Sequence, residues 1–163
     1  MRWIHHLFLD YFALKSAFPD TSLASIERRV AAQESRHRGE LRVAIEGGLP
    51  LQALLAGSTA HERALEHFAR LRIWDTEDNA GVLIYLLLAD RRVEIVADRG
   101  IDARVGDTAW ETICGAMQRE FAAGRFEPGL LAGLGAVSDL LAQHFPGRPG
   151  DNPNELPDSP VIL

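Results

Sequence analysis

Residues 79–98 read Asn-Ala-Gly-Val-Leu-Ile-Tyr-Leu-Leu-Leu-Ala-Asp-Arg-Arg-Val-Glu-Ile-Val-Ala-Asp, and this stretch decides the fold. Its first half, Gly81–Ala89, is continuously apolar, which is typical of a strand covered on both faces. Its second half, Arg92–Asp98, alternates apolar with polar residues and predicts a less buried strand. Asp90 and Arg91, between the two halves, predict the turn of a β-hairpin.

A further strand is predicted upstream of this hairpin. Residues Glu40–Glu46 alternate polar and apolar side chains, and a helix with Ala64, Phe68 and Leu71 on one face follows from about residue 59 to 71. The order strand, helix, strand favours a parallel pair with a right-handed crossover. We therefore expect a single α/β domain: a small mixed β-sheet, made of a βαβ unit plus the hairpin, flanked by helices on both faces.

The remaining segments divide the chain into three parts. Residues 1–19 predict an N-terminal helix that packs on the domain, residues 20–145 form the α/β domain, and residues 146–163 form a proline-rich, extended C-terminal tail. For the N-terminal helix, contact with a membrane surface or a partner helix is the alternative. For the tail, the alternatives are a mobile end and an apolar terminus that docks on its own domain or on a partner.

The last two predicted helices follow the hairpin, from Asp107 and from about Glu127 to Phe145. The final helix contains Gly129, Gly133 and Gly135, each of which costs about 1 kcal/mol relative to alanine in a helix interior. We expect close approach of the helix backbone to the sheet to offset this cost.

Composition limits the choice of ligand and location. The formal net charge of −6 argues against nucleic acid as a partner and makes a cation the more natural ligand. The single cysteine, Cys114, excludes an internal disulfide, and no apolar run approaches the ~20 residues that span a bilayer. We therefore expect a cytoplasmic protein that is not an integral membrane protein.

Acidic loops at one end of the hairpin are the best candidate site. Asp75 and Asp78 precede the first strand with Asn79, while Asp98 and Asp107 follow the second. Hairpin geometry brings the two groups together, and their carboxylates would repel one another unless Ca²⁺ or Mg²⁺ lay between them. A solvated acidic surface is the alternative.

Other known motifs do not fit. An EF-hand beginning at Asp75 would need glycine where Ala80 stands and glutamate where Leu86 stands. The histidines lack metalloprotease spacing, and no phosphate loop, nucleophile elbow or dinucleotide fingerprint is present, so we expect no organic cofactor.

In combination, several short motifs resemble the TPM-domain family over about residues 22–145. They are Gly39-Glu-Leu-Arg-Val, Asn79-Ala-Gly-Val-Leu-Ile, Asp90-Arg-Arg-Val-Glu-Ile, Gly100-Ile-Asp, Asp107, Phe121-x-x-Gly and Gly129-Leu. The resemblance implies a sheet flanked by helices, with Asn79, Asp90, Arg91 and Asp107 as matching residues. The family includes thylakoid-lumen phosphatase-like proteins, photosystem II repair factors and membrane accessory proteins.

Two functions follow from these observations. In the first, the domain is a non-catalytic accessory protein that engages a protein partner through its N-terminal helix or C-terminal tail, with a divalent cation in the acidic loops. In the second, it is a metal-dependent phosphatase-like hydrolase of small phosphate esters, in which the acidic residues hold the metal and Arg91, Arg99 or Arg104 offsets substrate charge. No nucleophile, catalytic histidine or general base emerges from the sequence, so the accessory function is the first choice.

Overall fold

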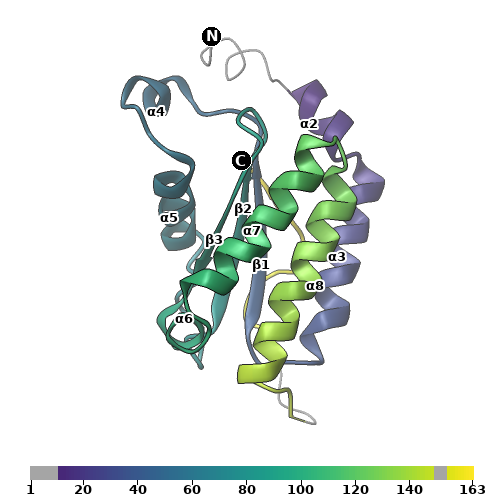
Figure 1. Ribbon diagram of the computed structural model, residues 1–163, viewed down its shortest axis with the longest axis vertical. Coiled ribbons are helices and arrows are strands. Elements are labelled where there is room, and N and C mark those ends of the chain that lie inside the picture. Colours follow the sequence, from purple (N-terminus) through teal and green to yellow (C-terminus); the bar gives the residue numbers. More distant parts are fainter. Residues whose placement is uncertain (1–10, 149–153) are drawn as a thin grey trace.

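The computed structural model describes residues 11–148 and 154–163 and shows a four-stranded mixed sheet (Figure 1). The strand order is β3-β2-β1-β4. The strands are β1 (Glu40–Glu46), β2 (Gly81–Leu87), β3 (Arg92–Ala97) and β4 (Val161–Ile162). β1 runs parallel to β2 and to β4, whereas β3 is antiparallel to β2. The prediction of a βαβ unit plus a hairpin in one α/β domain is confirmed.

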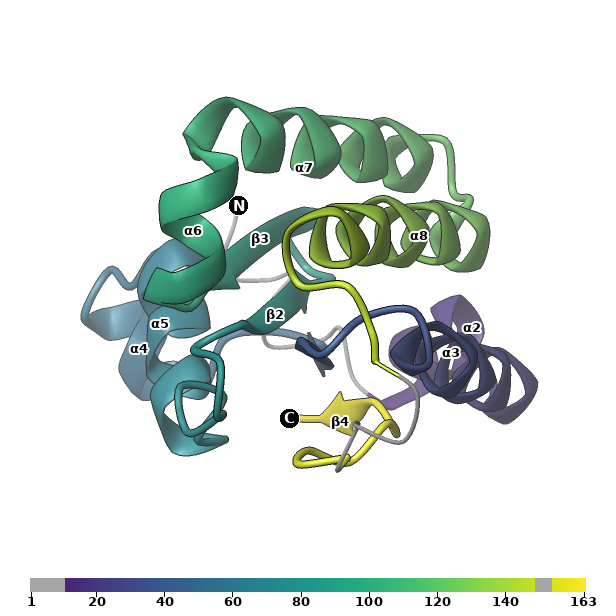
Figure 2. The same cartoon turned by 90° about the horizontal axis from the view of Figure 1, so that it is seen from below.

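Helices cover both faces of the sheet, and the sheet forms the middle layer (Figure 2). One face packs against α3 (Asp20–Glu34), α7 (Asp107–Ala122) and α8 (Phe126–His144). The other face carries α4 (Leu51–Leu55) and α5 (Ala60–Arg70). The short helices α2 (Tyr11–Ala17) and α6 (Arg99–Val105) precede α3 and α7 in the chain.

The two inner strands have no exposed residue, because helices and, over part of β1, the C-terminal segment cover them. Alternate side chains of β2 enter different cores: Val82, Ile84 and Leu86 face α7 and α8, while Leu83 and Tyr85 face α5. β3 is only partly buried, as its alternating sequence predicted. Consecutive side chains of β2 therefore point to opposite faces of the sheet and enter different cores.

A polar network lies within the core on the α5 side. The carboxylate of Glu46 on β1 accepts hydrogen bonds from the Tyr85 hydroxyl and from two nitrogens of the Arg63 guanidinium. The ring of His67 stacks on Tyr85 with 5.9 Å between the ring centroids. Because each charged group has a partner, the network fixes α5 on the sheet at the cost of removing these groups from water.

The glycines of α8 do not approach the sheet as we expected. An added Cβ at Gly129 would lie 2.6 Å from Cβ of Glu120, and one at Gly133 would lie within 3.0 Å of three Met117 side-chain atoms, both in α7. Gly135 instead faces Arg29 of α3. The glycines thus permit close packing between helices, and this part of the prediction was wrong.

The hairpin turn is longer than the two residues predicted. β2 ends at Leu87, which pairs with Arg92, so residues 88–91 form the turn. Arg91 has a φ of 50°, in the left-handed region, which lets the chain reverse there. The turn lies at the end of the hairpin opposite Asn79 and Asp98.

The two ends of the described chain contact the domain in different ways. In α2 and the residue after it, Leu14 and Phe18 are buried in the main core, while the part of the predicted N-terminal helix before Tyr11 lies outside the described residues. Val161 and Ile162 of the tail pair with Ala44 and Ile45 of β1. Within the described residues, no helix combines the length and the apolar character needed to cross a membrane.

Candidate functional site

Backbone hydrogen bonds hold the two loops at the open end of the hairpin together. The N–H of Asp98 donates to the carbonyl oxygen of Gly81 at 2.8 Å, and the N–H of Gly100 donates to that of Asn79 at 2.9 Å. A Cβ on Gly100 would lie 2.5 Å from the carbonyl oxygen of Asn79 and 2.6 Å from that of Asp78. Glycine is therefore required where the two loops touch.

The acidic residues before β2 are paired with arginines. Asp75 forms an ion pair with Arg72 at 2.6 Å, and Asp78 forms one with Arg38 at 2.8 Å. The amide oxygen of Asn79 accepts a hydrogen bond from Nε of Arg99, at 3.2 Å. These two carboxylates are thus already neutralised by protein groups and have less need of a cation.

Asp98 and Asp107, the acidic residues after β3, are in different surroundings. Oδ1 of Asp98 accepts the N–H of Arg99 at 2.7 Å and caps α6, while its Oδ2 is buried and has no hydrogen-bond partner among the described residues. Asp107 starts α7 and faces a separate cleft. The five predicted ligands therefore do not converge, and within the described residues no group of three or more His, Cys, Asp or Glu could hold a metal ion.

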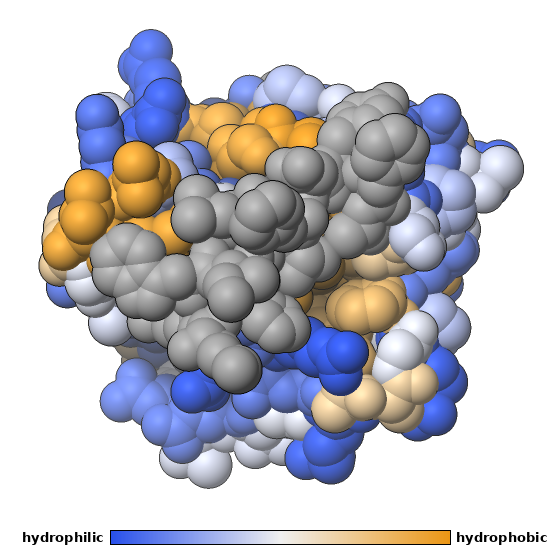
Figure 3. Space-filling view, turned by 90° about the horizontal axis from the view of Figure 1, so that it is seen from above, coloured by the Kyte–Doolittle hydropathy of each residue, from blue (hydrophilic) through white to orange (hydrophobic). Residues whose placement is uncertain are grey.

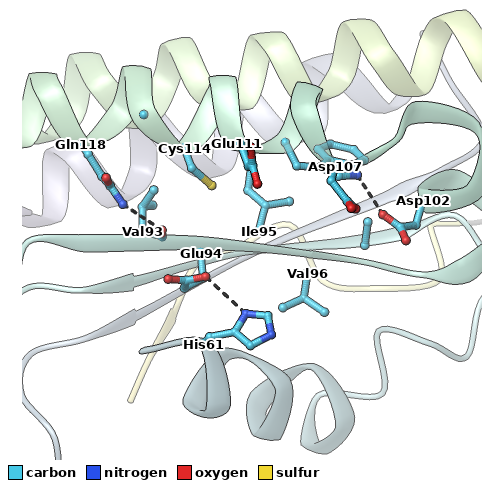
Figure 4. Close-up of a pocket in the computed structure, with 13 residues that line it drawn as sticks. His61, Val93, Glu94, Ile95, Val96, Asp102, Asp107, Glu111, Cys114 and Gln118 are labelled. Carbon is cyan, nitrogen blue, oxygen red and sulfur yellow. Dashed lines mark hydrogen bonds and ion pairs between the residues drawn. The ribbon is translucent and has the colours of Figure 1, made fainter. Parts of the chain in front are cut away.

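A cleft of about 540 Å³ runs along the open edge of β3, between α7 and α5 (Figure 4). Its acidic lining residues are Glu94, Asp102, Asp107 and Glu111. Its apolar lining includes Val93, Ile95 and Trp110, and the described lining residues include neither lysine nor arginine. We call this feature the acidic cleft. It has the charge and the shape to attract a cation.

Local structure accounts for the positions of the carboxylates from α6 and α7. Gly106, with a φ of 81°, makes the corner between the two helices. Nε1–H of Trp110 donates to Oδ1 of Asp102 at 3.0 Å and holds that carboxylate at the end of the cleft. Asp107 and Glu111 are four residues apart, so they share one face of α7.

The opposite wall is formed by Glu94 and His61. Glu94 points from β3 toward α5, where its Oε2 lies 3.3 Å from Nδ1 of His61 (Figure 4). Val93 and Ile95 point the other way, toward α7. The acidic cleft therefore extends around the edge strand and has carboxylates above and below it.

Cys114, on the α7 wall, lacks the features of a nucleophile. Burial raises the pKa of its thiol to about 11, and the nearby Glu94 carboxylate acts in the same direction. The thiol is therefore protonated at neutral pH, whereas nucleophilic cysteines need the thiolate. Gln118, one turn further along α7, donates its side-chain N–H to the carbonyl oxygen of Val93 at 3.3 Å and covers part of the strand edge.

Sequence reasoning found part of this lining and missed the rest. Asp107 was a predicted ligand, but Glu94 and Glu111 were not. The i, i+4 spacing of Asp107 and Glu111 was a usable signal. Glu94 is an ordinary polar position in an alternating strand, and its role as a wall depends on β3 being the edge strand of the sheet.

The family model for the TPM domain matches residues 14–140, and this protein belongs to the TPM-domain family. One similar solved structure is the BA42 protein from the psychrophilic bacterium Bizionia argentinensis. It is 29% identical, with a TM-score of 0.78 over 90% of this chain and 95% of that chain.

A second similar structure is the N-terminal domain of a protein from P. gingivalis. It is 21% identical, with a TM-score of 0.63 over 80% of this chain and 82% of that chain, and it shows the shared fold alone. The search of the curated proteins found no match.

Proposed function

We propose that this protein is a non-catalytic accessory domain that binds a hydrated divalent cation, Ca²⁺ or Mg²⁺, in the acidic cleft. The observation that carries the proposal is the lining: four carboxylates face the cleft, and its described lining offers no lysine or arginine to balance them. Glu94 has His61 as a partner, but Asp102, Asp107 and Glu111 have no basic partner among the described lining residues, and a bound cation would relieve the repulsion between them. Oxygen ligands suit both of these hard cations.

The spacing of the carboxylates favours a cation that keeps some of its water. The described residues form no cluster tight enough to surround a bare ion. Mg²⁺ gives up water reluctantly, and the weakest class of Ca²⁺ sites binds at about 10⁻⁴ to 10⁻³ M. We therefore expect millimolar affinity and little selectivity between the two ions.

Among the originally predicted ligands, Asp107 supports the proposal best, and Asp98 lies outside the acidic cleft. Asp107 lines the acidic cleft, and the buried Oδ2 of Asp98 lacks a partner among the described residues. Asn79 lies beside Asp98 at the hairpin end, where its backbone carbonyl accepts the N–H of Gly100 and its amide oxygen accepts from Arg99. Asp75 and Asp78 are paired with arginines outside the acidic cleft, so they are not ligands in this proposal.

A protein partner completes the proposal. Leu51 and Leu55 of α4 are 52% and 68% exposed, and Figure 3 shows apolar side chains on the surface at the end of the molecule that carries α4. Contiguous exposed apolar patches mark protein contacts, so this end of the molecule is a candidate contact surface. The N-terminal helix and the C-terminal tail are the other candidate contact segments, and the unpaired Cys114 is compatible with a cytoplasmic location.

The alternative function is a metal-dependent, phosphatase-like hydrolase of small phosphate esters, suggested by the resemblance to phosphatase-like TPM proteins. A phosphate ester would meet four carboxylates in the acidic cleft and would need a bound cation to offset their charge. The candidate phosphate partners are Arg99, which contacts Asn79, and Arg104. Both are close in sequence to Asp102 of the acidic cleft. The protonated Cys114 provides no nucleophile.

The test is a titration of the ¹⁵N-labelled protein, first with CaCl₂ and, on a separate sample, with MgCl₂. The amide chemical shifts are recorded by NMR at each ion concentration. We expect the amides of Asp102, Asp107 and Glu111 to shift progressively at millimolar ion. The double variant Asp102→Asn, Asp107→Asn should lose most of this shift, because it removes two charges while the new amide oxygen at position 102 can still accept the Trp110 hydrogen bond. Asp139→Asn, on the exposed face of α8, is the matched control and should titrate like the unaltered protein.

An assay of p-nitrophenyl phosphate hydrolysis with each ion separates the two functions. The accessory proposal predicts no turnover above that of the ion alone. Turnover that the double variant loses and the Asp139→Asn control retains would favour the hydrolase. Cleft amides that do not move at millimolar ion would contradict both cation-dependent functions.

A further inference from the structure

Two charged residues of β1 are buried against the C-terminal segment, residues 154–163. The carboxylate of Glu40 accepts hydrogen bonds from the backbone N–H groups of Glu155 and Leu156, each at 3.2 Å. The guanidinium of Arg42 donates to the carbonyl oxygen of Pro157 and, at 2.9 Å, to that of Ser159. Glu40 is 1% exposed and Arg42 6% exposed, so these backbone contacts compensate for the burial of charge.

The end of the segment is bound as a strand. Val161 and Ile162 pair with Ala44 and Ile45 of β1, and the N–H of Leu163 donates to the carbonyl oxygen of Ile45 at 3.0 Å. Along its length, β1 thus contacts the backbone of this segment through two side chains and a short parallel ladder. Addition of an extended peptide to a sheet edge is a common mode of peptide recognition.

Apolar contacts fix the register of the segment. Leu156 and Val161 pack against the core on the α5 side of the sheet. The polar contacts read only the backbone, so these two side chains carry most of the sequence preference. The site therefore suits an extended peptide with two apolar anchors five residues apart.

We infer that the outer edge of β1 is a binding site for an extended peptide, that residues 154–163 are its resident ligand, and that a second copy of this chain can supply the same segment in exchange. A second copy brings the identical backbone and anchors, so an exchanged dimer repeats every contact of the monomer. Such an exchange of identical elements is a low-cost route to a dimer.

Carboxyl groups around the segment add a pH dependence. Burial raises the pKa of Glu40 to about 7, and burial together with the neighbouring Asp158 raises that of Glu34 to about 8. The bound segment also places Glu155 near Glu40, while Arg42 offsets Asp158. The N–H groups of Glu155 and Leu156 act in the opposite direction on Glu40, so its protonation does not favour docking. Asp158 of the segment raises the pKa of Glu34, so docking should weaken as the pH rises through about 8.

Complementation between two full-length variants tests the exchange. Arg42→Ala weakens the site but leaves the segment intact, whereas Val161→Asp spoils the segment but leaves the site intact. We expect each variant alone to sediment as a monomer and an equimolar mixture to form a 1:1 dimer. Val161→Asp mixed with the double variant Arg42→Ala, Val161→Asp is the control, and it should stay monomeric because no intact segment is present.

A second measurement does not depend on how the variants fold. The synthetic peptide Asn-Glu-Leu-Pro-Asp-Ser-Pro-Val-Ile-Leu is added to the unaltered ¹⁵N-labelled chain. We expect the amides of Ala44 and Ile45 to shift and those of Val161 and Ile162 to move toward unstructured positions, and a scrambled peptide to do neither.

If the peptide does not change the amide chemical shifts of β1 and β4, the peptide site is overturned. Peptide binding together with a mixture that stays monomeric would overturn the role of the second copy. A dimer that also forms in the control mixture would place the interface elsewhere and would likewise overturn that role.

Discussion

At the scale of single residues, the carboxylate of Glu46 depends on one cation. Arg63 donates to it from two nitrogens and is only 11% exposed at its side chain. The hydroxyl of Tyr85 supplies a further hydrogen bond, and burial and the nearby carboxylate raise the pKa of that hydroxyl, so it stays protonated. Removing one partner from such a buried pair costs more than replacing the whole pair.

We expect Arg63→Met to lower the free energy of unfolding by about 3 to 5 kcal/mol, because it leaves the Glu46 carboxylate buried without its cation. Urea denaturation followed by circular dichroism measures the change. The control is Arg125→Met, which breaks an exposed pair with Glu120 and should leave the urea midpoint unchanged. Equal effects of the two variants would contradict the importance of the buried network.

The Glu34 carboxyl predicts a pH dependence of stability. Burial first, and then the Asp158 carboxyl, raise its pKa from 4.5 to about 8 in the folded protein. The folded state therefore holds a proton that the unfolded chain releases, and this contribution to stability is full below about pH 4.5 and is lost as the pH rises through about 8. Between about pH 4.5 and 8, the unfolding free energy of the Glu34→Gln variant should fall less steeply with pH than that of the unaltered protein. Denaturation curves recorded at a series of pH values measure this slope. An unchanged slope in this variant would contradict the assignment.

The thiol of Cys114 should react slowly. Its pKa is raised from 9.0 to about 11, so the thiolate fraction at neutral pH is about 100-fold lower than for an unperturbed cysteine. Alkylation by iodoacetamide, followed by mass spectrometry, should therefore be at least about 100-fold slower in the native protein than in the urea-unfolded chain. Similar rates in the two states would show that the native environment does not protect the thiol.

At the scale of elements, α7 and α8 pack closely where α8 has glycines. We expect Gly129→Ala to destabilise the protein by about 1 to 3 kcal/mol, because the new methyl group would meet the Glu120 Cβ and the Phe121 ring. Gly115→Ala is the matched control, since nothing in the described structure lies nearer than 3.6 Å to its added Cβ. That change should stabilise the helix by about 1 kcal/mol, through helix propensity alone. Thermal denaturation of both variants checks the opposite signs, and a stabilising Gly129→Ala would contradict the close packing.

Most elements of the fold could be predicted because their signals are local. The continuous apolar run of β2 and the alternation in β3 depend only on burial by neighbouring layers. The contact made by the α8 glycines could not be predicted, since spacing within one helix does not show which neighbour approaches it. The four-residue turn ending at Arg91 was also not predicted. Its last residue, Arg91, adopts a left-handed φ, and no glycine in the sequence signals that conformation.

The candidate site was predicted in part for similar reasons. Hairpin geometry was enough to place Asn79 near Asp98. The pairing of Asp75 and Asp78 with arginines was not visible, because Arg38 comes from a distant part of the sequence. Likewise, the position of Glu94 in the acidic cleft could not be predicted, because the sequence does not show that β3 is an edge strand of the sheet.

At the scale of the whole molecule, the two sides of the sheet carry different proposals: the edge strand β3 lies beside the acidic cleft, and β4 covers the outer side of β1. On β3, Gln118 covers the backbone beside the acidic cleft, and on β1 the C-terminal strand covers the backbone. Open strand edges invite pairing with other chains, so such covers are expected. The edge at β3 carries the proposed cation site and the edge at β1 the exchangeable peptide, which separates the two functions in space.

The most direct test of the cation proposal is to locate the ion itself. Mn²⁺, a paramagnetic substitute for Mg²⁺ and Ca²⁺, is added in small amounts to the ¹⁵N-labelled protein, and the broadening of each amide signal is measured. We predict broadening centred on Glu94, Asp102, Asp107 and Glu111, reversed by excess Mg²⁺. Broadening centred on another acidic surface, or spread evenly over the molecule, would contradict the assignment of the acidic cleft as the cation site.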